Sequence, residues 1–149
     1  MHKPTFQELH QLALDERQAG VLTMAYERRD TIEPSSENIA DSFVASLGFK
    51  ILGKAWREIE RKEAADLVDH ILYRDLAYQA PLMEKKTAAF IAEGFLALFS
   101  PHGSRYYTNG SIDQQNMLGW DPISHSTFDH GIVAFDDKNI GIVWVEDED

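Results

Sequence analysis

Apolar residues follow one period in the first part of the chain and another after Gly103. Before Gly103 they recur every three or four positions, which is the spacing of helices that bury one face. After it, runs of β-branched and aromatic residues alternate with turn residues, as in strands. The sequence therefore predicts a single α+β domain over residues 1–149, with a helical N-terminal two-thirds packed on a small C-terminal antiparallel β-sheet, a meander.

Two amphipathic stripes are the clearest helical signals. One runs through Ala64, Leu67, Val68, Ile71 and Leu72, and the other through Met83, Thr87, Phe90, Ile91, Gly94, Phe95 and Leu98. We expect helices over 64–79 and 83–99, separated at Pro81, because proline lacks the amide proton that a helix interior requires. The residues expected to be buried are Leu67, Ile71, Phe90, Phe95 and Ile142.

Weaker signals precede these two stripes. Thr5 and Glu8 have the spacing of a capping box, which predicts a helix over about 6–19. A second helix should begin at residue 35 or 36 and end at Gly48. The stretch between them, VLTMAYERRD, fits either a helix or an extended strand, and the sequence leaves both open.

Strand signals fill the last third of the chain. SRYYTNG over 104–110 fits a strand that enters an Asn-Gly turn, and FDHGIVAF and NIGIVWV fit two strands joined by DDKN. Residues 111–126 are expected to form a long polar loop, a kind of segment that is often functional. Both faces of the last strand are apolar, so each must be covered or left exposed.

Acidic residues are concentrated near the end of the chain. The formal net charge is −11, and residues 121–149 alone carry −7, with Lys138 as their one base. Such a field repels nucleic acid and anionic lipid and attracts basic partners, and its effect weakens as salt rises. The alternative interpretation is that the acids serve solubility and protect an edge strand from pairing with its own kind.

Several classes of function are disfavoured by composition. The chain has no cysteine, no run of about 20 apolar residues, no secretory signal and no phosphate-loop or nucleophile-elbow motif, so a cytoplasmic location without a membrane segment is expected. The basic residues of GKAWREIERK, over 53–62, are interleaved with glutamates. We interpret this segment as a solvated helix face and expect no direct nucleic-acid binding.

A small set of histidines and aspartates supports an alternative hypothesis, a metal-dependent or acid–base hydrolase. Imidazoles and carboxylates can bind zinc or transfer protons, but the spacing matches no known ligand pair. The preferred interpretation is that the protein has no catalytic residue, no metal and no cofactor. The residues of the alternative site are His102, His125, His130, Asp121 and Asp129.

Aromatic residues share the C-terminal third with the acids. Exposed tryptophan or tyrosine surrounded by carboxylates is typical of an interface for a basic partner, because aromatic side chains and arginine dominate interface hot spots. We expect the partner-binding residues to be Trp144, Tyr106, Trp120, Asp121, Asp136, Asp137, Glu146, Asp147, Glu148 and Asp149.

In its size, lack of cysteine, acidity and ending WVEDED, the chain resembles the immunity proteins of bacterial contact-dependent inhibition and other polymorphic toxin systems. The resemblance implies a cognate toxin domain as partner, tight one-to-one binding and no catalysis. A nuclease toxin is the favoured partner, because nuclease sites are basic and an acidic inhibitor complements them. A non-toxin adaptor would carry the same kind of surface.

Overall fold

The computed structural model describes residues 3–29, 36–113 and 116–148. Its helices are α1 (Phe6–Glu16), α2 (Ser36–Ser46), α3 (Arg61–Tyr73) and α4 (Lys85–Leu96), with a 3-10 turn η1 (Gly53–Ala55). Its strands are β1 (Val21–Arg28), β2 (Arg57–Ile59), β3 (Arg105–Thr108), β4 (Gly110–Asp113), β5 (Asn116–Trp120), β6 (Phe128–Phe135) and β7 (Asn139–Asp147).

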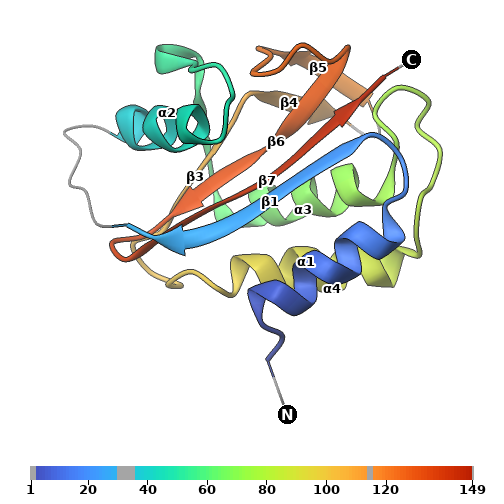
Figure 1. Cartoon of the computed structure of the whole chain (residues 1–149), viewed down its shortest axis with the longest axis horizontal. Helices are drawn as coiled ribbons and strands as arrows, with labels where there is room; N and C mark the ends of the chain where they lie inside the picture. Colours follow the sequence, from blue (N-terminus) through green and yellow to red (C-terminus); the bar gives the residue numbers. More distant parts are fainter. Residues whose placement is uncertain (1–2, 30–35, 114–115, 149) are drawn as a thin grey trace.

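Five of the strands form one antiparallel sheet in the order β1-β7-β6-β3-β2. Strands β4 and β5 form a separate hairpin. Helices α1, α3 and α4 lie on one face of the sheet and α2 lies on the other, so the molecule has three layers (Figure 1).

The apolar residues of β7 explain why both faces are covered. Val143 and Val145 point into a core shared with α1, α3 and α4. Ile142 and Trp144 point into a second core with α2, Trp56 and Ile123. The alternation of side chains along a strand places apolar residues on both sides of β7, and a helix on the far face buries the second side, which the sequence had left open.

The expected division into a helical N-terminal two-thirds and a C-terminal sheet is wrong. Strands β1 and β2 come from the first 60 residues and form the two edges of the sheet. Strand β1 pairs with β7 over its whole length, from Val21 opposite Glu146 to Arg28 opposite Asn139. Its sequence is compatible with both a helix and a strand, and the hydrogen bonds available along β7 decide for the strand.

The segment expected to continue a helix to residue 79 instead leaves α3 after Tyr73. A compact turn follows, in which Asp75 Oδ1 accepts hydrogen bonds from the backbone N–H groups of Ala77 and Tyr78. Gln79 has a positive φ of 59° within this turn. Side chains that bond to nearby backbone groups compete with helical hydrogen bonds, so α3 ends here.

Four of the five residues expected to be buried are buried, namely Leu67, Ile71, Phe95 and Ile142. The prediction for Phe90 is wrong, since 51% of its surface is exposed. Its neighbour Ile91 faces the core, and one residue along a helix turns the side chain by about 100°. The basic segment over 53–62 is not one helix face either, because residues 57–59 form β2.

The region expected to be a polar loop, 111–126, contains most of the β4–β5 hairpin. The Asn-Gly pair does not close a hairpin between β3 and β4, because β3 pairs with β2 and β6 whereas β4 pairs with β5. The Asn109 side chain is buried. Its Nδ2 donates hydrogen bonds to the carbonyl oxygens of Asp121 and Asp129. No helix in the described ranges is long and apolar enough to cross a membrane.

The capping box at the start of α1 is confirmed. Thr5 Oγ1 accepts from the N–H of Glu8 at 3.2 Å, and Glu8 Oε1 accepts from the N–H of Thr5 at 2.9 Å. The helix ends at Glu16 rather than near residue 19. The next residue, Arg17, turns inward and buries its guanidinium.

Replacing Thr5 by alanine is expected to lower the free energy of unfolding by about 1 kcal/mol, because it leaves a helix N–H group without an acceptor. Urea unfolding followed by circular dichroism measures this loss. The exposed Gln7→Ala, on the first turn of the same helix, is the matched control. Equal stabilities of the two variants would show that the capping box contributes nothing.

Candidate functional site

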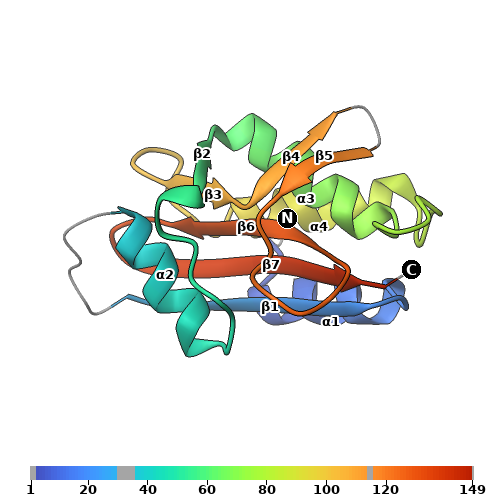
Figure 2. The ribbon, with the colours of Figure 1, turned by 90° about the horizontal axis from the view of Figure 1, so that it is seen from above.

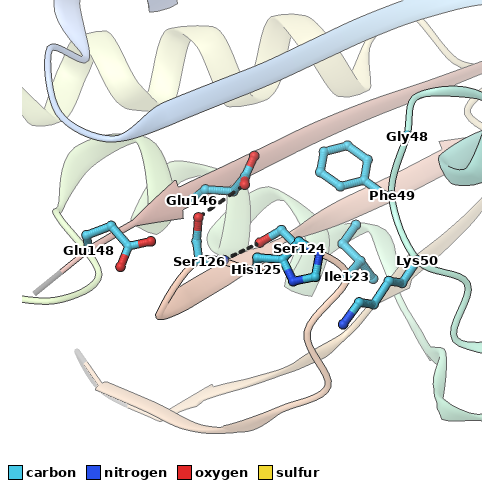
Figure 3. A pocket seen from close by; sticks show the side chains of 9 residues that line it. All are labelled: Gly48, Phe49, Lys50, Ile123, Ser124, His125, Ser126, Glu146 and Glu148. Atoms are coloured by element: carbon cyan, nitrogen blue, oxygen red, sulfur yellow. Dashed lines mark hydrogen bonds between the residues drawn. The ribbon is translucent and has the colours of Figure 1, made fainter.

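A pocket of about 340 Å³ lies at the end of β7, on the face of the sheet that carries α2 (Figure 3). Three segments that are distant in the sequence form it. They are Gly48–Lys50 after α2, Ile123–Ser126 between β5 and β6, and Glu146 with Glu148 at the end of β7.

The loop on one side of the pocket is held by the buried carboxylate of Asp129. This carboxylate accepts from the N–H groups of Ile123 at 3.0 Å and Ser124 at 2.9 Å, and from Ser124 Oγ at 2.7 Å. Trp144 Nε1 and Asn109 Nδ2 also donate to it, at 3.1 and 3.0 Å. Five donor groups compensate the burial of the charge, so the loop has a defined shape.

The second side of the pocket is joined to the first by the backbone. The N–H of Lys50 donates to the carbonyl oxygen of Ile123 at 2.9 Å. Ile123 is buried and packs in the same core as Trp144. The backbone around the pocket is therefore positioned by the core and by main-chain hydrogen bonds.

Two carboxylates line the pocket without a basic partner. Glu146 Oε1 accepts from Ser126 Oγ at 3.2 Å, and Glu148 accepts from the N–H and the hydroxyl of Thr127. The hydrogen bonds from Thr127 lower the pKa of Glu148. Neither glutamate forms an ion pair with any described lysine or arginine, although Lys50 lines the same pocket from the opposite side (Figure 3).

Both serine hydroxyl groups of the pocket donate hydrogen bonds to carboxylates. Ser124 Oγ donates to Asp129 and Ser126 Oγ donates to Glu146, and within the described structure neither is hydrogen-bonded to His125. Nucleophilic catalysis needs a hydroxyl within reach of its base. The arrangement is instead suited to binding a cation.

The five residues of the hydrolase hypothesis are dispersed. His125 lines the pocket, while His102 is exposed in the connection between α4 and β3 and Asp121 is exposed after β5. His130 and Asp129 are adjacent on β6 and point to opposite faces of the sheet. Within the described residues, no group of three or more histidines, aspartates or glutamates could hold a metal ion.

His130 lies in the interior with a fixed tautomer. Its Nδ1 is 2.7 Å from Asn109 Oδ1, which must accept because Asn109 Nδ2 donates elsewhere. Its Nε2 has no hydrogen-bond partner among the described residues. Burial, together with the smaller effects of the nearby His70 and Arg57, lowers the pKa of His130 to about 3.

Two of the three aromatic residues expected at an interface lie in the core, which corrects that prediction. Trp144 is completely buried and meets Trp56 edge to face, with ring centroids 6.0 Å apart. Tyr106 is buried, and its hydroxyl accepts from Arg61 Nη1 at 3.3 Å. Trp120 is half-buried and stacks on Phe128.

The acids expected at one binding face are divided between the two ends of β7. Asp136 and Asp137 lie in the turn between β6 and β7, whereas Glu146, Asp147 and Glu148 lie at the other end (Figure 2). At about 3.4 Å per residue these ends are roughly 30 Å apart. Asp121 is exposed in the connection that leads to the pocket loop, and Asp149 lies outside the described residues.

Two of these acids are structural, which also corrects the prediction. Asp136 is buried and accepts from the N–H groups of Ser100, Lys138 and Asn139. Burial opposes its ionisation, but the three donors outweigh burial and lower the pKa of Asp136. Asp147 is buried in an ion pair with Arg17. Neither carboxylate is available to a partner.

Sequence reasoning named three residues of the pocket, His125, Glu146 and Glu148, but did not bring them together. It missed Gly48–Lys50 and the two serines, because their proximity arises from the packing of α2 on the sheet.

Comparison with protein-family models, with curated proteins and with solved structures found no match.

Proposed function

We propose that this protein is a cytoplasmic binding protein that neutralises a basic partner domain, in the manner of immunity proteins, and that the pocket at the end of β7 is its docking site. The observation that carries the proposal is the pair of glutamates in the pocket, Glu146 and Glu148, neither of which forms an ion pair with a described base, although Lys50 lines the same pocket.

The charge of the protein supports the same partner. Net charge of −11 accelerates encounter with a basic surface and disfavours nucleic acid and anionic lipid. A nuclease toxin has a basic active site because it holds phosphates, so an acidic inhibitor is attracted to it for the same physical reason. The serine hydroxyls of the pocket, held by carboxylates, favour binding over catalysis.

The proposal is tested by affinity capture with the purified protein at low and moderate salt. We expect a basic domain to be retained in a one-to-one complex and its activity, nuclease activity in the favoured case, to fall when this protein is added. Capture of only acidic or neutral partners, or turnover of a substrate by this protein alone, would contradict the proposal.

Replacing Glu146 and Glu148 together by glutamine is expected to slow association with the captured partner and to flatten its salt dependence. Peripheral charges act mainly on encounter, so dissociation should change less. Stopped-flow association over a salt series measures this effect. Asp137→Asn combined with Glu27→Gln is the matched control, because it also removes two charges and both carboxylates are exposed at the opposite end of the sheet. Equal slowing by the control would show that only net charge matters.

A further inference from the structure

One segment of the pocket, Gly48–Lys50, has an exposed apolar residue on each side of it in the sequence. Leu47 and Ile51 flank the pocket segment Gly48–Lys50 and are 37% and 61% exposed. They are two of the six large apolar side chains that the described structure leaves exposed. The segment comes from the end of α2 on one side, while Glu148 comes from the end of β7 on the other (Figure 3).

The segment over 47–51, which includes Lys50, has a defined backbone. Gly48 has a φ of +90°, a conformation that glycine adopts without strain, and nothing lies within 4 Å of the position of a Cβ there. The N–H of Phe49 donates to the carbonyl oxygen of Val44 at 3.0 Å, and that of Lys50 donates to Ile123. Phe49 packs against the core below α2, whereas Ile51 remains largely in water.

We propose that the pocket and the 47–51 segment form one binding groove for a partner segment in which apolar and arginine side chains alternate. An apolar side chain of the partner would cover Leu47 and Ile51. A neighbouring guanidinium would be bound by Glu146 and Glu148, since carboxylates bind guanidinium with charge-assisted hydrogen bonds. This inference rests on the proposed function for its partner and specifies what that partner presents.

Charge decides among the possible occupants of the groove. A second copy of this chain would bring its own excess of acids against Glu146 and Glu148, and an anionic lipid surface would be repelled in the same way. A basic segment gains both from the carboxylates and from covering apolar surface. The combination of carboxylates with exposed apolar surface therefore favours an amphipathic basic segment over a purely polar one.

Three capped pentapeptides test the groove directly, with alternating sequences of arginine and leucine, arginine and serine, and glutamate and leucine. Binding is followed by amide chemical shifts at low and moderate salt. We expect the arginine–leucine peptide to shift residues 47–51, 123–126 and 146–148. It should bind roughly tenfold more tightly than the arginine–serine peptide, as burial of about 60 Å² of apolar surface implies. The glutamate–leucine peptide should not bind.

Two variants test the apolar side and the acidic side of the groove separately. Ile51→Ser should weaken the arginine–leucine peptide roughly tenfold and leave the arginine–serine peptide unchanged, for the same apolar area. Glu148→Gln should weaken both peptides. The matched controls are Leu14→Ser, an exposed leucine on α1, and Asp137→Asn, at the far end of β7. Both should bind like the wild type.

Shifts centred on the β6–β7 turn, or equal losses in Ile51→Ser and Leu14→Ser, would overturn the inference. So would concentration-dependent dimerisation of the wild type that Ile51→Ser abolishes, because the occupant would then be a second copy. A different result would contradict the proposed function, namely capture of only acidic or neutral partners. A basic partner captured by the protein while the peptides map elsewhere leaves the neutralisation of a basic partner standing and removes the pocket and the groove as its docking site.

Discussion

Replacing Asp147 by alanine is expected to lower the free energy of unfolding by about 3–5 kcal/mol, the range for breaking a buried ion pair by removing one partner. Arg17 Nη2 and Nη1 donate to the Asp147 carboxylate at 2.7 and 2.9 Å, and both side chains are almost completely buried. The N–H of Leu76 donates to the same carboxylate. The variant would leave a guanidinium charge and a backbone donor uncompensated inside the protein.

The rest of the Arg17 guanidinium is already satisfied by backbone carbonyl oxygens. It donates to Ile71, Ala19 and Arg74 at 2.9, 2.6 and 3.2 Å. The ion pair therefore ties the end of α1 to the end of α3 and to the last residues of β7. Loss of Asp147 should loosen all three elements at the pocket end of the molecule.

Urea unfolding of Asp147→Ala measures this effect, and Glu148→Ala is the control because its carboxylate is exposed one residue away. Replacing both members of the pair, Arg17→Met with Asp147→Leu, should recover part of the loss, since no unpaired charge remains although Leu76 N–H and the carbonyl oxygens that Arg17 bonded lose their partners. A loss in Asp147→Ala no larger than in the control would show that the pair contributes little. Charge variants intended to probe binding should leave Asp147 intact.

Acidification is expected to destabilise the protein through His130. Burial holds the pKa of His130 at about 3, whereas the unfolded chain has the ordinary value of 6.5. The stability due to the neutral imidazole is fully present above pH 6.5. Below it the unfolded state binds a proton that the folded state does not, so stability falls by about 1.4 kcal/mol per pH unit as the pH drops toward 3.

The window from pH 6.5 to 5 isolates the histidine contribution from that of most carboxylates. Burial also lowers the pKa of His70, which adds a loss of the same sign. His130→Gln should therefore show a shallower decline than the wild type, by about 1.4 kcal/mol per pH unit, because glutamine cannot be protonated. His102→Gln removes an exposed imidazole and is the matched control. Identical slopes in wild type and His130→Gln would contradict the prediction.

The candidate site shows how a charge pattern misleads when it is considered along the chain alone. Asp136, Asp137, Asp147 and Glu148 belong to one acidic region in the sequence. In the structure, Asp136 and Asp147 satisfy buried donors, and neither remains for a partner. A carboxylate that ends a strand can stabilise the fold or bind a ligand, and its neighbours in space decide which.

Local spacing determined the existence of most elements. The capping box of Thr5 and Glu8, the stripe from Ala64 to Leu72 and the strands over 128–135 and 139–147 depend on interactions within one segment or across one turn. These interactions repeat at 3.6 or 2 residues, so they are visible in the sequence. The apolar character of both faces of β7 was likewise visible, although the sequence left open whether the second face was covered or exposed.

Only the tertiary structure determined which segments cover the two faces of β7. Val21–Arg28 became a strand because β7 offered unpaired hydrogen-bonding groups, and Trp144 became core because α2 packed over it. The pocket, too, exists only where Gly48–Lys50 meets the end of β7. These outcomes depend on contacts between residues far apart in the chain. Their free energy depends on burial and on pairing with a distant partner, which a local pattern of side chains does not encode.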